Sequence, residues 1–309
     1  MSSDSVHQPV MVSETLEALS AQPGGIYLDA TVGEGGHSAA ILEASDPVGR
    51  VLGIDLDPRS LEVAFQRLER FGQRFMPVAG NYGDMVALAR SLGVSQVDGV
   101  LMDLGFSSRQ IGAPGYGFSF QYDEPLDMRY DPAGPLTAAV VVNNYSEQEL
   151  ARVIYEYGEE PRSRPIARRI VGSRPVLSTT QLASLVASAS GPRRGRRIHP
   201  ATRTFQAIRM EVNNELGNLA RGLEAAVQLL APMGRLAVIS YHSLEDRAVK
   251  NFMQRQSAQC ICPPEVPVCV CGHQPTLKLV HRRVIKPRAR EIQENPRSRS
   301  AKLRVAYRL

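Results

Sequence analysis

The chain has 309 residues, 43% of them hydrophobic, and carries a formal net charge of +5 at pH 7. This composition is ordinary for a globular protein and excludes a wholly disordered chain. Its apolar runs fall far short of the ~18 residues of a membrane span, and its start lacks the basic and apolar stretches of a signal peptide. We therefore expect a cytoplasmic protein with no membrane partner, whose four cysteines are reduced.

The first third of the chain alternates short β-branched runs with segments of helical periodicity. This pattern is typical of a parallel sheet covered by helices. Strands are expected over residues 26–30, 51–55, 75–79 and 97–103. Helices are expected up to residue 43, from Pro58 to residue 70, and over residues 85–91.

The middle of the chain changes character. Residues 106–135 are rich in Gly, Pro, Ser and aromatics without a clear period, and helices are expected over 147–157, 165–172, 179–189 with Ser178 as N-cap, and 202–210. A helix over 214–230, a strand over 235–240, a helix over 244–256 and strands over 277–285 and 302–309 follow. The pattern predicts a doubly wound α/β sheet, residues 1–112 and 213–309, interrupted by a helical insert domain, residues 113–212.

A glycine-rich turn follows the first strand and reads Asp-Ala-Thr-Val-Gly-Glu-Gly-Gly-His-Ser from Asp29 to Ser38. Its glycines let a ligand approach the backbone, and the next helix offers free amides. Asp55 ends the second strand, where a carboxylate can bind both hydroxyls of an adenosine ribose. Ser38 replaces the third glycine of the dinucleotide pattern. With Asp29 able to orient the loop and face a cationic methionine end, S-adenosylmethionine is favoured over NAD.

Two more motifs follow strands that end at the same edge of the sheet. Asp103 begins Asp-Leu-Gly-Phe-Ser-Ser, which is similar to the Asp-Pro-Pro-Tyr signature of amino-methyltransferases, with Phe106 in the aromatic place. Its carboxylate would hold the N–H groups of an exocyclic amine. Ser-Tyr-His-Ser-Leu-Glu-Asp-Arg begins at Ser240 and makes His242 either a catalytic residue of the pocket or a structural histidine.

Positive charge is concentrated in two segments. Residues 193–209 hold six arginines and no acid, and residues 278–308 hold eleven Lys and Arg against two acids, so the rest of the chain is acidic. This distribution favours a nucleic-acid partner over two solvated faces. Phe205 lies in the first segment at helical spacing with Ile208, and we expect it in the core.

The four cysteines form two Cys-x-Cys pairs, Cys260 with Cys262 and Cys269 with Cys271. Two such pairs can hold a tetrahedral zinc ion, although Cys-x₂-Cys is the commoner spacing. Four reduced cysteines in a loop stiffened by prolines explain the pattern equally well. No metal site is assigned from the sequence.

Together these motifs resemble the MraW family of bacterial 16S rRNA (cytosine-N4)-methyltransferases. The matching segments begin at His7, Asp29, Asp103, Gly117, Leu126, His199, Ser240 and Asn295. The resemblance implies a class I, Rossmann-like S-adenosylmethionine-dependent methyltransferase sheet with an inserted α-helical domain. It also implies methylation of N4 of a cytidine in the decoding region of 16S rRNA, within the 30S ribosomal subunit.

The resemblance also implies site residues. Carried over by position, the cofactor contacts fall on Gly35, Gly36, His37, Asp55, Tyr82, Asp103 and Gln110. Asp103 and His242 are the candidate catalytic residues. Phe106 stands where a smaller apolar residue is common, which weakens the expectation that it stacks on the base.

Three other functions stay open at this point. A nicotinamide-dependent dehydrogenase would share the glycine loop and Asp55, but not the carboxylate-led motif at the fourth strand. A non-catalytic RNA-binding assembly factor would explain the arginines and leave Asp29, Asp55 and Asp103 without a task. A DNA cytosine-N4 methyltransferase is the alternative closest in chemistry.

Overall fold

The computed structural model describes residues 9–105, 115–191, 199–263, 265–266 and 268–309. The chain divides into two compact units. The sheet unit comprises Met1–Gly105 and Leu216–Leu309, and the helical unit comprises Phe106–Glu215. The domain boundaries expected near residues 112 and 213 stay predictions.

The sheet unit is built on one seven-stranded sheet with the order β3-β2-β1-β4-β5-β7-β6. Its strands are β1 (Ile26–Asp29), β2 (Arg50–Asp55), β3 (Phe75–Ala79), β4 (Val97–Asp103), β5 (Leu230–Ser240), β6 (Leu277–Leu279) and β7 (Lys302–Arg308). The first five strands are parallel, and β7 pairs antiparallel with both β5 and β6. The α/β class predicted from the sequence is confirmed.

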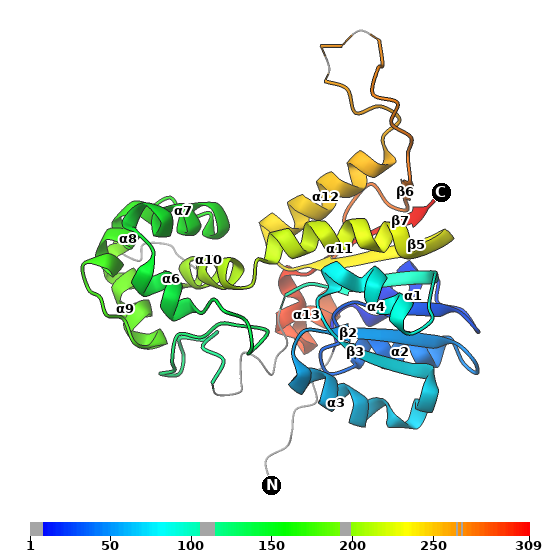
Figure 1. The fold of residues 1–309 in the computed structure, drawn as a ribbon, viewed down its shortest axis with the longest axis horizontal. Coiled ribbons are helices and arrows are strands. Elements are labelled where there is room, and N and C mark those ends of the chain that lie inside the picture. Colours follow the sequence, from blue (N-terminus) through cyan, green and yellow to red (C-terminus); the bar gives the residue numbers. More distant parts are fainter. Residues whose placement is uncertain (1–8, 106–114, 192–198, 264, 267) are drawn as a thin grey trace. The chain divides into compact units, whose positions relative to one another are not determined.

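Helices cover both faces of this sheet (Figure 1). They are α1 (Val12–Leu19), α2 (Gly36–Ala44), α3 (Pro58–Leu68), α4 (Met85–Ser91), α11 (Glu215–Leu229), α12 (Ser243–Ser257) and α13 (Ala289–Glu294), with 3₁₀ helices η1 (Glu69–Arg74), η2 (Tyr82–Asp84) and η3 (Pro296–Ser300). Neighbouring strand residues point to opposite faces. Leu28 therefore packs into a core with α4, α11 and α12, whereas Tyr27 packs into a second core with α1, α2 and α3.

Burial on both faces explains why the strands were recognisable in the sequence, since such strands are continuous apolar runs. Residues 277–285 were expected to form one strand, but β6 ends at Leu279. His281, Arg282 and Arg283 are exposed, and the chain returns to β7 only at Ile285, which bridges to Leu303. A run of side chains that favour water thus interrupts the strand.

The helical unit contains α6 (Ala138–Asn144), α7 (Glu147–Gly158), α8 (Ser163–Val171), α9 (Thr179–Ala189) and α10 (Thr202–Val212). Ser178 accepts a hydrogen bond from the Gln181 N–H at the start of α9, so the predicted N-cap is confirmed. Phe205 is buried in the core of this unit, as expected. Within the described residues, no helix is both long and apolar enough to cross a membrane.

Candidate active site

The sheet places the predicted motifs at its carboxyl edge. Asp29 ends β1, Asp55 ends β2, Asp103 ends β4, and Ser240 ends β5. Strand order reverses at β1, which lies between β2 and β4. In open α/β sheets, ligands bind in the crevice that this reversal opens at the carboxyl edge. The motifs singled out in the sequence therefore lie together at the carboxyl edge of the sheet.

The loop between β1 and α2 needs its glycines for two different reasons. Gly35 has a φ of 78°, in the left-handed region, and a Cβ there would lie 3.0 Å from Cδ1 of Leu68. Gly36 begins α2, where a Cβ would lie 2.9 Å from Cγ of Pro9. Gly35 is the N-cap residue of α2 and has no side chain that could cap the helix. The first amides of α2 therefore remain available to an anionic group.

Asp29 stabilises this loop through hydrogen bonds to two of the residues that follow it. It is fully buried, and its carboxylate accepts hydrogen bonds from Oγ of Ser38 at 2.7 Å and from the N–H of Thr31 at 3.2 Å. Burial raises the pKa of Asp29, while the nearby His37 lowers it. Ser38, at the position of the third glycine of the dinucleotide pattern, thus donates a hydrogen bond to the buried carboxylate of Asp29.

Asp55 is held between the glycine loop and α3. Its Oδ2 accepts from the N–H of Gly33 at 2.7 Å, and its Oδ1 accepts from the N–H of Asp57 at 2.9 Å. Burial raises the pKa of Asp55 to about 6. The group is therefore mostly ionised at pH 7, and each oxygen retains a further lone pair for a ligand hydroxyl.

Asp103 is the residue at which three motifs meet. Its Oδ1 accepts a 2.8 Å hydrogen bond from the hydroxyl of Tyr241, which directly follows β5. Its Oδ2 lies 3.5 Å from Nε2 of His37, at the start of α2. Its backbone N–H donates to Oγ1 of Thr31 at 2.7 Å. The glycine-loop, fourth-strand and fifth-strand motifs are thus joined at one carboxylate.

The surroundings set the charge of the two partners of Asp103. Burial alone would lower the pKa of His37, but the carboxylates of Asp103, Asp29 and Glu291 raise it above its usual value. Burial and the adjacent Asp103 raise the pKa of Tyr241 well above its usual value. Tyr241 is therefore a neutral phenol that donates a hydrogen bond to Asp103 at any physiological pH.

His242 is the N-cap of α12. Its Nδ1 accepts from the N–H of Glu245 at 3.3 Å, and Oε2 of Glu245 accepts from the N–H groups of Tyr241 at 2.9 Å and His242 at 3.3 Å. These contacts fix the turn that presents Tyr241 to Asp103. The catalytic role expected for His242 stays a prediction.

Sequence reasoning missed Tyr241 and Glu291. Tyr241 lies inside the Ser240 motif, but only its neighbour His242 was singled out. Glu291, in α13, accepts from the N–H of Met11 at 2.6 Å and is one of only two acids in the basic segment 278–308. That isolation was the one available signal that Glu291 has a specific partner.

The other predicted cofactor residues have different outcomes. Tyr82 begins η2 after β3, and its ring lies against α11 at Gly222, where a Cβ would lie 2.5 Å from Cδ2 of the ring. Gln110 and Phe106 lie outside the described residues, and so do the arginines at 193, 194, 196 and 197.

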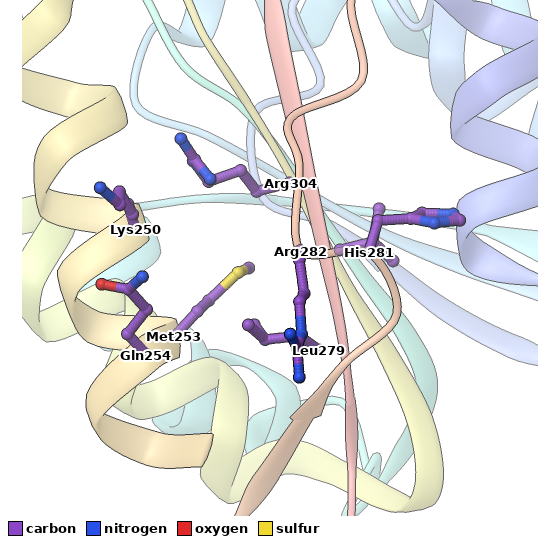
Figure 2. A pocket seen from close by; sticks show the side chains of 8 residues that line it. Lys250, Met253, Gln254, Leu279, His281, Arg282 and Arg304 are labelled. Carbon is purple, nitrogen blue, oxygen red and sulfur yellow. The ribbon is translucent and has the colours of Figure 1, made fainter. Parts of the chain in front are cut away.

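Part of the C-terminal basic segment lines a small surface pocket. Figure 2 shows Lys250 and Gln254 from α12 facing Arg282 and Arg304 across it. Asp246 neutralises part of this charge, because it pairs with Arg304 at 2.7 Å and with Lys302 at 3.0 Å. Of the exposed cations of this segment, Arg288 and Arg290 pair with Glu14 and Glu294. Within the described part of the chain, no ion pair involves five others, Arg282, Arg283, Lys286, Arg297 and Arg299.

Comparison of the sequence with known proteins identifies one family. A family model described as the MraW methylase family matches residues 4–309. The ribosomal RNA small subunit methyltransferase H of Thermomicrobium roseum is 55% identical over 98% of this chain and 94% of its own length. The protein of the same name from Geobacter sulfurreducens is 52% identical over 98% of this chain and 99% of its own length. The solved structure of an N-methyltransferase from Bradyrhizobium japonicum has a TM-score of 0.43 at 10% identity, covering 96% of this chain and 93% of that one.

Proposed function

The chain belongs to the MraW methylase family, and from that premise we propose that it methylates N4 of a cytidine in the decoding region of 16S rRNA, with S-adenosylmethionine as the methyl donor. The names of its relatives support a ribosomal RNA substrate. Its partner is then the 30S subunit or the 16S rRNA before assembly, in the cytoplasm. The observation that carries the chemistry is the contact between Tyr241 and Asp103 at the sheet edge.

The residues at the carboxyl edge fit this donor, which supplies a methyl group on a positively charged sulfur. A Cβ on Gly35 would crowd Leu68, and a Cβ on Gly36 would crowd Pro9, so both positions need glycine for the loop to keep this backbone path. The first amides of α2 suit the carboxylate of an amino acid. Asp55, fixed by two backbone N–H groups, offers acceptors to two ribose hydroxyls.

Asp103 has the properties that the transfer to an exocyclic amine requires. The lone pair of such an amine is drawn into the ring, so the nitrogen becomes a nucleophile only when positive charge on it is favoured. A carboxylate that accepts an N–H bond from the amine favours that charge. Tyr241 fixes one oxygen of Asp103, which leaves the carboxylate in one orientation before the substrate arrives.

The exposed cations of the C-terminal segment support contacts with RNA phosphates. Arg282, Arg283 and Lys286 lie on one exposed stretch, and Arg297 and Arg299 lie in η3. Phosphate contacts of this kind hold a nucleic acid without reading its sequence. The choice of the base then falls to the site around Asp103.

Family membership argues against the nicotinamide-dependent dehydrogenase. The DNA methyltransferase and the non-catalytic assembly factor are distinguished by one experiment. Purified chain is incubated with methyl-labelled S-adenosylmethionine and, in parallel, naked 16S rRNA, 30S subunits and DNA. We expect label in RNA only, recovered as N4-methylcytidine after nuclease digestion. Label in DNA alone, in another nucleoside, or nowhere while RNA is bound would refute the proposal.

A further inference from the structure

A segment of the sheet unit outside the candidate active site has no role in the function proposed above. The Cys loop, residues 258–276, joins α12 to β6, and Figure 1 shows it in orange extending away from the sheet. Its described residues form no helix or strand. Its two ends are tied together by the N–H of Thr276, which donates to the carbonyl of Gln256 at 2.9 Å.

Four thiols meet within this loop. The sulfurs of Cys260, Cys262, Cys269 and Cys271 all lie within 4.8 Å of one another. The Cys269 and Cys271 sulfurs are 3.5 Å apart, and those of Cys271 and Cys260 are 3.9 Å apart. A disulfide needs about 2.05 Å, so the four cysteines are all free.

The two shortest separations are close to those around a tetrahedrally coordinated metal ion. In a tetrahedral site with Zn–S bonds of about 2.3 Å, neighbouring sulfurs are about 3.8 Å apart. Soft thiolates arranged as a tetrahedral S₄ set select zinc or iron rather than the hard cations. The two Cys-x-Cys pairs thus bring four sulfurs within 4.8 Å of one another, close to the arrangement that such an ion needs, although the spacing along the sequence is less common.

Apolar packing does not account for the convergence of the loop. Its hydrophobic side chains face solvent, and Val268 and Val270 are 70% and 79% exposed. Small segments that bury little apolar surface usually depend on a disulfide or a metal. Ordering the loop costs conformational entropy, which bonds from four thiolates to one ion would offset.

We propose that Cys260, Cys262, Cys269 and Cys271 bind one zinc ion as thiolates, each thiol releasing its proton on binding. Four protein sulfurs complete the tetrahedron, so the ion has no open position and its role is structural. The site is also separated from the candidate active site. Tyr241 lies just before α12, and the Cys loop begins just after it. This helix of 15 residues is about 22 Å long.

The test uses the full chain, expressed with zinc in the medium and purified without chelator. We expect one zinc per chain by elemental mass spectrometry, and thiols that react with a colorimetric reagent only after a chelator strips the ion. Refolding with Co²⁺ should give the sulfur-to-cobalt charge-transfer and tetrahedral d–d absorption bands. Four freely reactive thiols with no bound metal would overturn the proposal, and so would stable disulfides under reducing conditions.

Matched variants separate the four sulfurs from the neighbouring histidine. Cys269→Ser with Cys271→Ser should lose the zinc, while His273→Asn should retain it, because Nε2 of His273 lies 3.0 Å from the carbonyl of Arg255. Loss of zinc in His273→Asn would overturn the four-sulfur set. Circular dichroism of each variant reports whether the sheet unit is folded, so a folded double Cys variant that still binds one zinc also contradicts the proposal.

Discussion

The hydroxyl of Tyr241 donates a 2.8 Å hydrogen bond to Oδ1 of Asp103, although 138 residues separate the two in the chain. The bond joins the ends of β4 and β5, which are neighbours in the sheet. It leaves Oδ2 of Asp103 to face His37 at 3.5 Å. The orientation of the carboxylate is thus set by the fold before any ligand binds.

Tyr241→Phe should lower the turnover of methyl transfer about tenfold or more while the melting temperature changes little. A hydrogen bond to a charged group contributes about 1.5–3 kcal/mol, and here this bond orients the carboxylate of Asp103. Single-turnover transfer to RNA measures the effect. Tyr155→Phe is the control, because Tyr155 is 63% exposed. Equal rates for the two variants would remove Tyr241 from the site.

Asp103→Ala should abolish turnover and leave the thermal melting profile without ligand unchanged. The carboxylate is partly exposed, with 18% of the side chain accessible, so its loss creates no buried cavity. Some loss of cofactor affinity is also expected, because the family resemblance gives Asp103 a cofactor contact. Transfer within a few-fold of the wild-type rate would contradict the proposed role.

Asp55→Ala should weaken the binding of S-adenosylhomocysteine at least about tenfold. Two hydrogen bonds from ribose hydroxyls to a charged acceptor are lost, at a cost of roughly 1.5–3 kcal/mol. Isothermal calorimetry measures the affinity. Since Asp55 also accepts from Gly33 and Asp57, Asp55→Asn is the better-packed companion variant. Unchanged affinity in both variants would show that the ribose binds elsewhere.

The affinity for S-adenosylhomocysteine should also fall as pH drops through about 6. The pKa of Asp55 is raised to about 6 by burial, so the acceptor is ionised above that pH and protonated below it. A protonated carboxyl has lost acceptor capacity toward the ribose, which fixes the sign. Calorimetry between pH 5 and pH 8 should show this step in the wild type. Its persistence in Asp55→Asn would assign the step to another group.

The sequence predicted most of the sheet and the edge at which the candidate site residues gather, but not the contacts among them. Buried strands such as β4 are apolar runs that can be recognised locally. The Tyr241–Asp103 bond depends on which strands become neighbours, and no local pattern encodes that. The helix α6 was missed because Val140, Val141 and Val142 favour a strand. Thr137 caps it, and burial of Val141 and Val142 overrides the strand preference of the valines.

Two basic segments compete for the RNA phosphates, and salt dependence distinguishes them. For each tenfold rise in salt concentration, the binding constant falls by about 0.7–0.9 log units per neutralised phosphate. Replacing the arginines at 193, 194, 196 and 197 with Gln should weaken rRNA binding and flatten this slope. The parallel variant replaces Arg282, Arg283 and Lys286, which are exposed and make no ion pair in the described part of the chain.

Each set should reduce the salt slope in proportion to the phosphate contacts that it makes. The affinity for S-adenosylhomocysteine should stay unchanged, since neither set includes a residue of the glycine loop or Asp55. Filter binding of 30S subunits at several salt concentrations measures the slope. As a matched control, Arg304→Gln removes a cation that Asp246 already neutralises at 2.7 Å, so the slope should stay near wild type. If the 193–197 variant keeps the wild-type slope and the 282–286 variant does not, the RNA contacts lie in the C-terminal segment. If neither variant alters the slope, both segments are solvated surface, and the charge distribution gives no support to an RNA partner.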